Sequence, residues 1–178
     1  MSLILTTEQL EQLIAQARHD APNETCGIIA GKQGRALKIY ALKNIDPDPR
    51  IRYNVEPLEL LNALRETEDL GREHLAIYHS HPASPAYPSP TDIARAFYPE
   101  VVYVLISLMN PELAIMRGFH IVEGRVEEVM IEIEDKDESP RTNPGRAARP
   151  TGRPRTGRTV AALSKRRPAG GKARRARR

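Results

Sequence analysis

The chain has 178 residues and is 40% hydrophobic, which is enough for one compact domain with a substantial core. Its single cysteine, Cys26, excludes a disulfide framework and a cysteine-rich zinc finger, and it fits a reducing, cytoplasmic compartment. No apolar run approaches the ~20 residues that span a bilayer, and the N-terminus lacks a basic-then-apolar signal, so we expect no membrane partner.

The net charge of +4 conceals two oppositely charged regions. Residues 1–140 hold all 23 acidic residues and 13 of the 27 basic ones, whereas residues 141–178 hold the other 14 basic residues. Hydrophobic periodicity stops near residue 136, so we expect a domain of residues 1–135 followed by a disordered basic tail, 136–178. The basic segment could simply aid solubility, fold onto the acidic domain, dock an acidic partner or bind nucleic acid through phosphates.

The first half of the chain alternates helical and extended patterns. In chain order we expect a helix from Thr6 or Thr7 to about His19, strands over 24–31 and 36–42 joined by a turn at Gln33-Gly34, a further strand over 51–55, and a helix from Pro57 to Leu70. The first helix has its apolar residues at helical spacing, and the proline-rich segment 46–49 predicts a loop.

The second half is richer in strands. We expect an apolar strand over 75–78, a loop over 83–88, a helix from the Ser89 cap to Phe97, a central strand over 101–108, and strands over 113–122 and 125–133 around a turn at Glu123-Gly124. Helices and strands interleave along the chain, so the fold class is mixed α/β.

Two histidines separated by one residue, His79 and His81, follow the 75–78 run, and Asp92 comes eleven residues later. In extended backbone the side chains at i and i+2 point to the same face, so both imidazoles can aim at one point. Two imidazoles and one carboxylate suit zinc (Zn²⁺), and three protein ligands leave a position open, as hydrolytic metal sites require.

These residues also have ordinary interpretations. Nearby histidines often bind nothing, and Ser89, Pro90 and Asp92 have the order of a helix cap, a first helical residue and an acid in the first turn. Both interpretations of Asp92 can hold together, because a carboxylate in the first turn is rigidly placed. Several other metal families are excluded: residues 82–99 lack the glutamate of cupins, the chain is too short for a barrel amidohydrolase, and the zincin His-Glu-x-x-His pattern is absent.

The spacing of these motifs resembles the JAMM/MPN+ metallopeptidase family, also called the Mov34 or JAB group, in its small prokaryotic form. The family signature is an upstream glutamate, His-x-His-Pro, about six residues, and Ser-x-x-Asp. Here Glu24, the stretch 79–82, six intervening residues and the stretch 89–92 match it in order and spacing. The resemblance covers roughly residues 3–133 and implies a curved, largely antiparallel sheet flanked by helices.

The resemblance also implies roles. His79, His81 and Asp92 would bind zinc, Glu24 would be the general base, and Ser89 would donate a hydrogen bond to the oxyanion. Without the family match, Glu24 would be an ordinary surface or turn acid. Cys26 is expected to pack in the core rather than to act as a nucleophile.

The implied substrate is the peptide or isopeptide bond after the C-terminal glycine of a ubiquitin-like or sulfur-carrier β-grasp protein. The enzyme would release either a modifier from a lysine or cysteine from a sulfur carrier. Two other classes stay open, a non-catalytic scaffold of the same fold and a nucleic-acid-associated protein acting through its basic tail. Retention of all five motif positions favours the peptidase.

Overall fold

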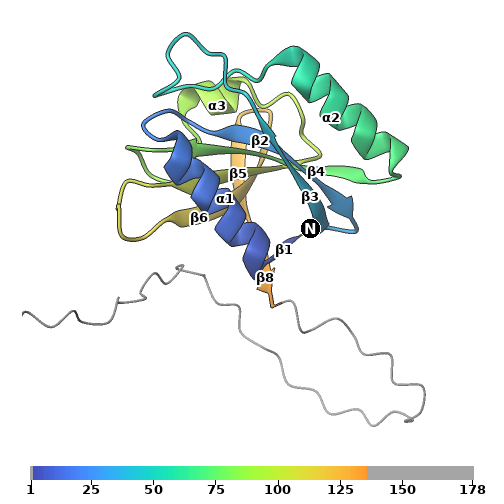
Figure 1. Ribbon diagram of the computed structural model, residues 1–178. Coiled ribbons are helices and arrows are strands. Elements are labelled where there is room, and N and C mark those ends of the chain that lie inside the picture. Colours follow the sequence, from blue (N-terminus) through green and yellow to red (C-terminus); the bar gives the residue numbers. More distant parts are fainter. Residues whose placement is uncertain (1, 136–178) are drawn as a thin grey trace, which may run out of the picture.

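Eight strands form one mixed sheet, in the order β7-β6-β5-β4-β2-β3-β1-β8, in the computed structural model, which describes residues 2–135 (Figure 1). The strands are β1 (Leu3–Thr6), β2 (Cys26–Lys32), β3 (Arg35–Leu42), β4 (Glu73–His81), β5 (Val102–Ser107), β6 (Ile115–Val122), β7 (Arg125–Val129) and β8 (Ile131–Glu134). The helices are α1 (Thr7–Asp20), α2 (Pro57–Asp69) and α3 (Pro90–Ala94). No helix within residues 2–135 is long and apolar enough to cross a membrane.

The sheet is strongly curved. Strands β7 and β8 follow each other in the chain, separated only by Met130, yet they lie at opposite ends of the strand order. The two edges therefore approach each other: Gly118 of β6 lies close to Ile131 of β8, and the Leu3 amide donates to the Met130 carbonyl at 3.1 Å. The mixed α/β fold with a curved sheet, expected from the sequence and the resemblance, is confirmed.

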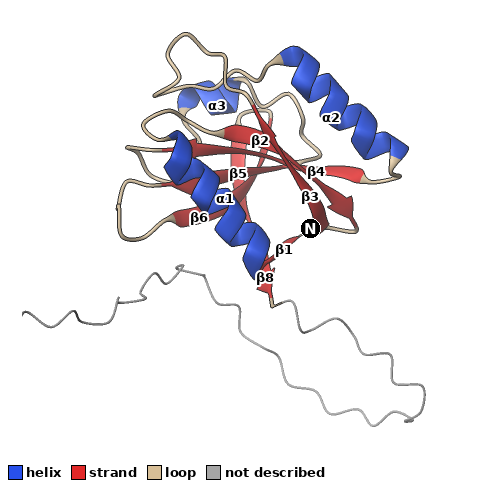
Figure 2. Cartoon of the chain, in the orientation of Figure 1, coloured by secondary structure: helices blue, strands red, loops and turns tan. Residues whose placement is uncertain are grey.

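Helices α1 and α2 cover opposite faces of the sheet, which is the central layer of the domain (Figure 2). Leu13 and Ala17 of α1 belong to one buried cluster, and Ala63 of α2 belongs to the other. Consecutive residues of β2, Ile28 and Ile29, are divided between the two clusters. Side chains alternate along a strand, so a strand covered on both faces is apolar at successive positions.

The two long helices, the β2–β3 hairpin and the strand before the histidines lie where the sequence predicts them. The prediction of a strand over 51–55 is wrong, because the Asn44 side chain forms hydrogen bonds with backbone groups of this segment. Its amide donates to the Arg52 carbonyl, its side-chain oxygen accepts from the Asn54 amide, and only an isolated bridge joins Asn44 to Val55.

Other boundaries also differ. Strand β1 was not expected, and helix α3 ends at Ala94 instead of Phe97, whose side chain is exposed. The strand expected over 125–133 is divided at Met130, because β7 pairs with β6 whereas β8 pairs in parallel with β1. The predicted disordered tail, 136–178, lies outside the described residues.

Gly27 lies where three strands approach one another closely. It pairs with Ala41 of β3 and with Tyr78 of β4. A Cβ atom at this position would collide with the Tyr40 carbonyl oxygen and the Tyr78 ring. The backbone oxygen cannot move without disrupting the β2–β3 ladder, so only glycine fits here.

We predict that Gly27→Ala destabilises the domain by about 1–3 kcal/mol or more, because overpacking forces backbone shifts. Gly118→Ala is the matched comparison, since its nearest neighbours lie at 3.1–3.2 Å and can yield slightly. Urea unfolding should show the larger loss for Gly27→Ala. Equal losses for the two variants would contradict this account of β2.

Candidate metal centre

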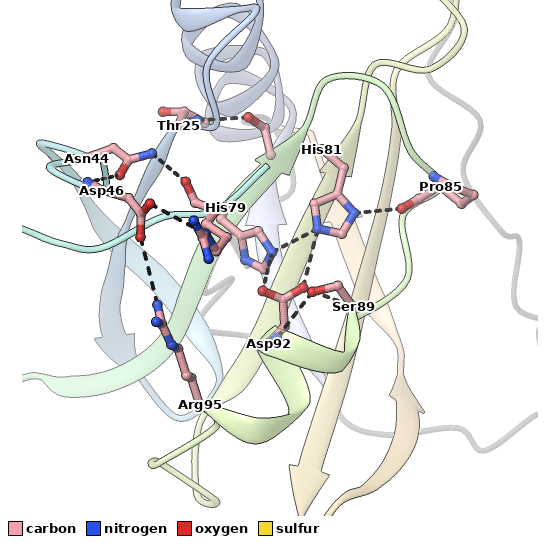
Figure 3. A network of polar contacts seen from close by, with 11 residues as sticks. Thr25, Asn44, Asp46, His79, His81, Pro85, Ser89, Asp92 and Arg95 are labelled. Atoms are coloured by element: carbon pink, nitrogen blue, oxygen red, sulfur yellow. Dashed lines mark hydrogen bonds and ion pairs between the residues drawn. The ribbon is translucent and has the colours of Figure 1, made fainter. Parts of the chain in front are cut away.

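The end of β4 brings the two histidines together. His79 and His81 lie on one face of the strand, are 0% and 4% exposed, and their Nε2 atoms are 3.1 Å apart. Each Nε2 also lies 3.4 Å from an Asp92 oxygen, His79 from Oδ1 and His81 from Oδ2 (Figure 3). The three side chains offer ligand atoms that all lie within 4.8 Å of one another.

A capping box at the start of α3 holds Asp92. The Ser89 amide donates to Asp92 Oδ2 at 2.7 Å, and the Asp92 amide donates to Ser89 Oγ at 3.2 Å. Pro90 occupies the first turn, where a proline needs no amide partner. The helix-cap interpretation of the segment is therefore confirmed, and the cap itself orients the carboxylate towards the imidazoles, where it could also serve as a ligand.

The two imidazoles are fixed in different ways. His81 Nδ1 lies 2.8 Å from the Pro85 carbonyl oxygen, which only accepts, so Nδ1 carries a proton and the neutral ring keeps its lone pair on Nε2. Tyr53 stacks on His79, with ring centroids 4.5 Å apart. His79 Nδ1 is buried without a hydrogen-bond partner among residues 2–135, so packing rather than a second acceptor orients that ring.

This donor set fits a divalent cation. Two Nε2 lone pairs and a carboxylate converge on one point, and such groups stay in contact only if they share a proton or a metal ion. Two nitrogens and one oxygen are a usual ligand set for catalytic zinc, which keeps a further position for water or substrate. His79, His81 and Asp92 are therefore the residues that could hold the ion.

Burial and charge act against each other at these ligands. Burial lowers the pKa of His79 below its usual value. Burial also acts to lower the pKa of His81, but Asp92, the Pro85 carbonyl and Glu24 raise it overall. Burial acts to raise the pKa of Asp92, yet contacts with both imidazoles hold it far below its usual range. Asp92 is thus a carboxylate throughout the physiological pH range.

Glu24 is buried beside the ligands, with 5% of its surface exposed. Burial raises the pKa of its carboxyl to about 7, a change that His81 opposes and the Asp92 charge supports. The Glu24 amide donates to the Pro49 carbonyl at 2.7 Å, and Asn44 donates to the Glu24 carbonyl at 3.0 Å. Glu24 is therefore a buried carboxyl group and not a surface acid, and a pKa raised in this way is common at functional sites.

The two segments of the site are joined by reciprocal hydrogen bonds. The Thr25 amide donates to Ser80 Oγ at 2.9 Å, and the Ser80 amide donates to the Thr25 carbonyl at 3.0 Å. Ser80 points away from the ligands, as the strand period predicts, and uses its hydroxyl to hold the residue next to Glu24. Gln16 of α1 adds two hydrogen bonds to this connection, since it donates to Thr25 Oγ1 and accepts from the Tyr78 hydroxyl.

Two polar residues near the site, Cys26 and Ser107, make structural contacts. Burial raises the pKa of the Cys26 thiol to about 12, and its Sγ faces the Leu42 carbonyl, so this cysteine packs in the core as expected. Ser107 donates to the Ser84 carbonyl at 2.6 Å and steadies the loop after His81.

Sequence reasoning missed three contributors: Tyr53, the Pro85 carbonyl, and the ion pairs of Asp46 with Arg52 and Arg95. Tyr53 and Asp46 lie on the loop between β3 and α2, far in sequence from the histidines. Of the three contributors, only the Pro85 carbonyl could have been suspected from the sequence. A proline-rich loop directly after the histidines has carbonyl groups without secondary-structure partners, and these can accept from an imidazole.

Several known proteins are similar to this chain in sequence, and a solved structure is similar to it in fold. A CysO-cysteine peptidase of Mycobacterium tuberculosis is 35% identical over 133 residues, which cover 74% of this chain and 90% of that protein. A probable TtuB-protein conjugate cleaving protease of Thermus thermophilus is 39% identical over 116 residues, covering 65% and 74% of the two chains. The solution structure of protein DSY2949 from Desulfitobacterium hafniense has a TM-score of 0.69 and 34% identity, covering 76% of this chain and 95% of that one.

The family match agrees with the geometry. Residues 6–118 match the family described as prokaryotic homologs of the JAB domain, and this stretch is more than half of the chain. It includes the upstream glutamate, the histidine pair and the Ser-x-x-Asp segment, so the resemblance drawn from the motif spacing is confirmed. The chain belongs to the prokaryotic JAB family.

Proposed function

We propose that this protein is a zinc-dependent peptidase that hydrolyses the bond after the C-terminal glycine of a ubiquitin-like or sulfur-carrier β-grasp protein. The observation that carries the proposal is the convergence of His79, His81 and Asp92 beside a buried Glu24 whose pKa is raised to about 7. A scaffold of this fold has no need for such a group of buried, ionisable residues, whose burial costs free energy.

The three ligands would hold zinc through two Nε2 atoms and one carboxylate. When bound, the ion acts as a Lewis acid, which lowers the pKa of a coordinated water and polarises the scissile carbonyl. The protein supplies the orientation: the Pro85 carbonyl fixes the His81 tautomer, and the capping box fixes Asp92.

Glu24 would transfer the proton. Its carboxylate takes a proton from the attacking water and delivers it to the nitrogen of the leaving amine, a role worth about 10²–10⁴-fold in rate. A pKa near 7 allows it to accept and release that proton at neutral pH. The Ser89 hydroxyl, whose oxygen already accepts from the Asp92 amide, keeps its own proton to donate to the developing oxyanion.

The substrate class rests on the relatives. One is named for cleaving CysO-cysteine, and another for cleaving TtuB-protein conjugates. We infer that this chain also acts on a carrier protein joined through its C-terminus. An extended C-terminal tail can bind by adding to the backbone beside the metal centre, and glycines can pass through a narrow entrance.

Loss of a ligand should abolish metal binding. We predict that His81→Ala and Asp92→Ala lower zinc affinity by more than the 10–100-fold that is typical when a hydrogen-bond partner of a ligand is lost. The measurement is zinc content after dialysis, together with the thermal shift on adding zinc. Asp69→Asn, an exposed acid at the end of α2, is the control and should bind as the parent does. Full zinc content in the ligand variants would contradict the assignment.

The proposed function is tested by cleavage of a glycine-terminated carrier conjugate. Glu24→Gln should keep its zinc but lower kcat by about 10²–10⁴-fold, because glutamine cannot accept the proton. Ser89→Ala should lower kcat by ~10²–10³-fold if its hydroxyl serves the oxyanion. Cleavage by Glu24→Gln at the parental rate would exclude the base role, and a zinc-loaded parent that cleaves no such conjugate would refute the peptidase.

The pH dependence of stability provides a test independent of activity. Burial raises the pKa of Glu24 from its usual 4.5 to about 7, so the folded state binds the proton more tightly than the unfolded state. The resulting destabilisation is absent below about pH 4.5, grows between about pH 4.5 and 7, and stays constant at higher pH. In metal-free protein, Glu24→Gln should therefore be more stable than the parent at pH 8, by on the order of 1–3 kcal/mol, and similar at pH 4.5. Urea unfolding in chelator measures this, and parallel pH profiles would contradict it.

A further inference from the structure

Three charged side chains form a cluster beside the metal centre. Asp46 and Arg52 lie on the loop between β3 and α2, and Arg95 caps the C-terminus of α3. Asp46 Oδ1 lies 3.6 Å from Arg52 Nε, and Asp46 Oδ2 lies 3.9 Å from Arg95 Nη1. Figure 3 shows Asp46 and Arg95 on the His79 side of the centre, away from Pro85.

The cluster has unused binding capacity. The Asp46 side chain is only 6% exposed, whereas those of Arg52 and Arg95 are 43% and 52% exposed. Within residues 2–135, neither guanidinium makes another hydrogen bond or ion pair. Two guanidinium groups share one carboxylate through long contacts, so the cluster carries one net positive charge and free donors at the surface. A guanidinium fork matches the geometry of a carboxylate, which it binds bidentately.

The cluster lies next to the proposed base. The Asn44 amide donates both to the Glu24 carbonyl and to the Arg52 carbonyl, at 3.0 Å each, so one side chain ties the arginine segment to the glutamate segment. Asp46 is close enough to Glu24 to raise its pKa electrostatically. Arg95 comes three residues after Asp92, and positions three apart lie on the same face of a helix.

This location identifies which part of a substrate would meet the arginines. Glu24 delivers its proton to the leaving nitrogen, so the groups attached to that nitrogen lie on the Glu24 side of the scissile bond. In a free α-amino acid, the carboxylate is attached to the carbon next to that nitrogen. In a lysine side chain, four methylene groups separate the nitrogen from the α-carbon, and no carboxylate is near.

We propose that Arg52 and Arg95 bind the α-carboxylate of the leaving amino acid, so that this enzyme prefers carrier adducts of a free amino acid to carrier–lysine conjugates. The inference rests on the proposed peptidase function and specifies its leaving group. In the reaction, water adds across the peptide bond. The carbonyl carbon keeps the hydroxyl as the carrier's new C-terminal carboxylate, and the nitrogen leaves as the amine of the amino acid.

The test compares leaving groups that differ in one charge. One glycine-terminated carrier is joined to cysteine, to cysteinamide, to the ε-amine of a lysine peptide, and to the ε-amine of a lysine peptide flanked by glutamates. The parent should cleave the cysteine adduct with a kcat/KM about 10–100-fold above that for the cysteinamide adduct, the range expected for a charge-assisted hydrogen-bond pair. Equal kcat/KM values for these two substrates would overturn the proposal while leaving the peptidase intact. Cleavage of none of the four would instead refute the proposed function.

Variants locate the recognition. Arg95→Gln and Arg52→Gln should reduce the cysteine-to-cysteinamide preference towards one, and Arg95→Lys should retain part of it, because the charge remains but the fork is lost. Arg65→Gln, an exposed arginine of α2, is the charge-matched control and should keep the full preference. Equal losses on both substrates would indicate a structural role and contradict carboxylate recognition. A loss confined to the glutamate-flanked peptide would also contradict it, since the arginines would then read acidic side chains of a target protein.

Discussion

The pairing of Thr25 with Ser80 is the interaction on which the site depends. Two hydrogen bonds, one from each backbone amide, join the segment that carries Glu24 to the strand that carries both histidines. The antiparallel register continues this alignment, with Cys26 opposite His79 and Gly27 opposite Tyr78. The proposed proton transfer requires the glutamate and the imidazoles to be held together, because a proton moves only between groups at contact distance.

The centre is assembled from rigid elements and costs the fold free energy. His79, His81 and Glu24 are buried and Asp92 is half-buried, and burial disfavours the charged form of each group. Around them, the structure uses ordinary devices: a helix cap for Asp92, a loop carbonyl for His81 and a stacked tyrosine for His79. A divalent cation would compensate the negative charge there, so metal binding at this site would also stabilise the fold.

Much of the fold was predictable because local patterns and tertiary packing agree. The apolar residues of α1 recur at helical spacing and are the ones that are buried, and the continuous apolar run of β5 is buried at every position. Prediction failed where tertiary contacts override local preference. Residues 51–55 have a strand-like composition, but their backbone groups form hydrogen bonds with the Asn44 side chain instead of with a neighbouring strand. In this loop conformation Tyr53 stacks on His79. Strand β8 is separated from β7 because it pairs with β1 at the other end of the curved sheet. The sequence of β1, a short apolar segment, does not indicate this pairing.

The sequence by itself predicted the candidate ligand set, since His79 and His81 share a face through the period of a strand and Asp92 is fixed by a local cap. These relations span few residues and depend on backbone geometry alone. Only the tertiary structure decided that Glu24 is buried beside those ligands, and that Asp46, Arg52 and Arg95 meet at the same place. Strand pairing and loop packing bring together residues from separate segments, and their interaction depends on distances and burial that no local pattern encodes.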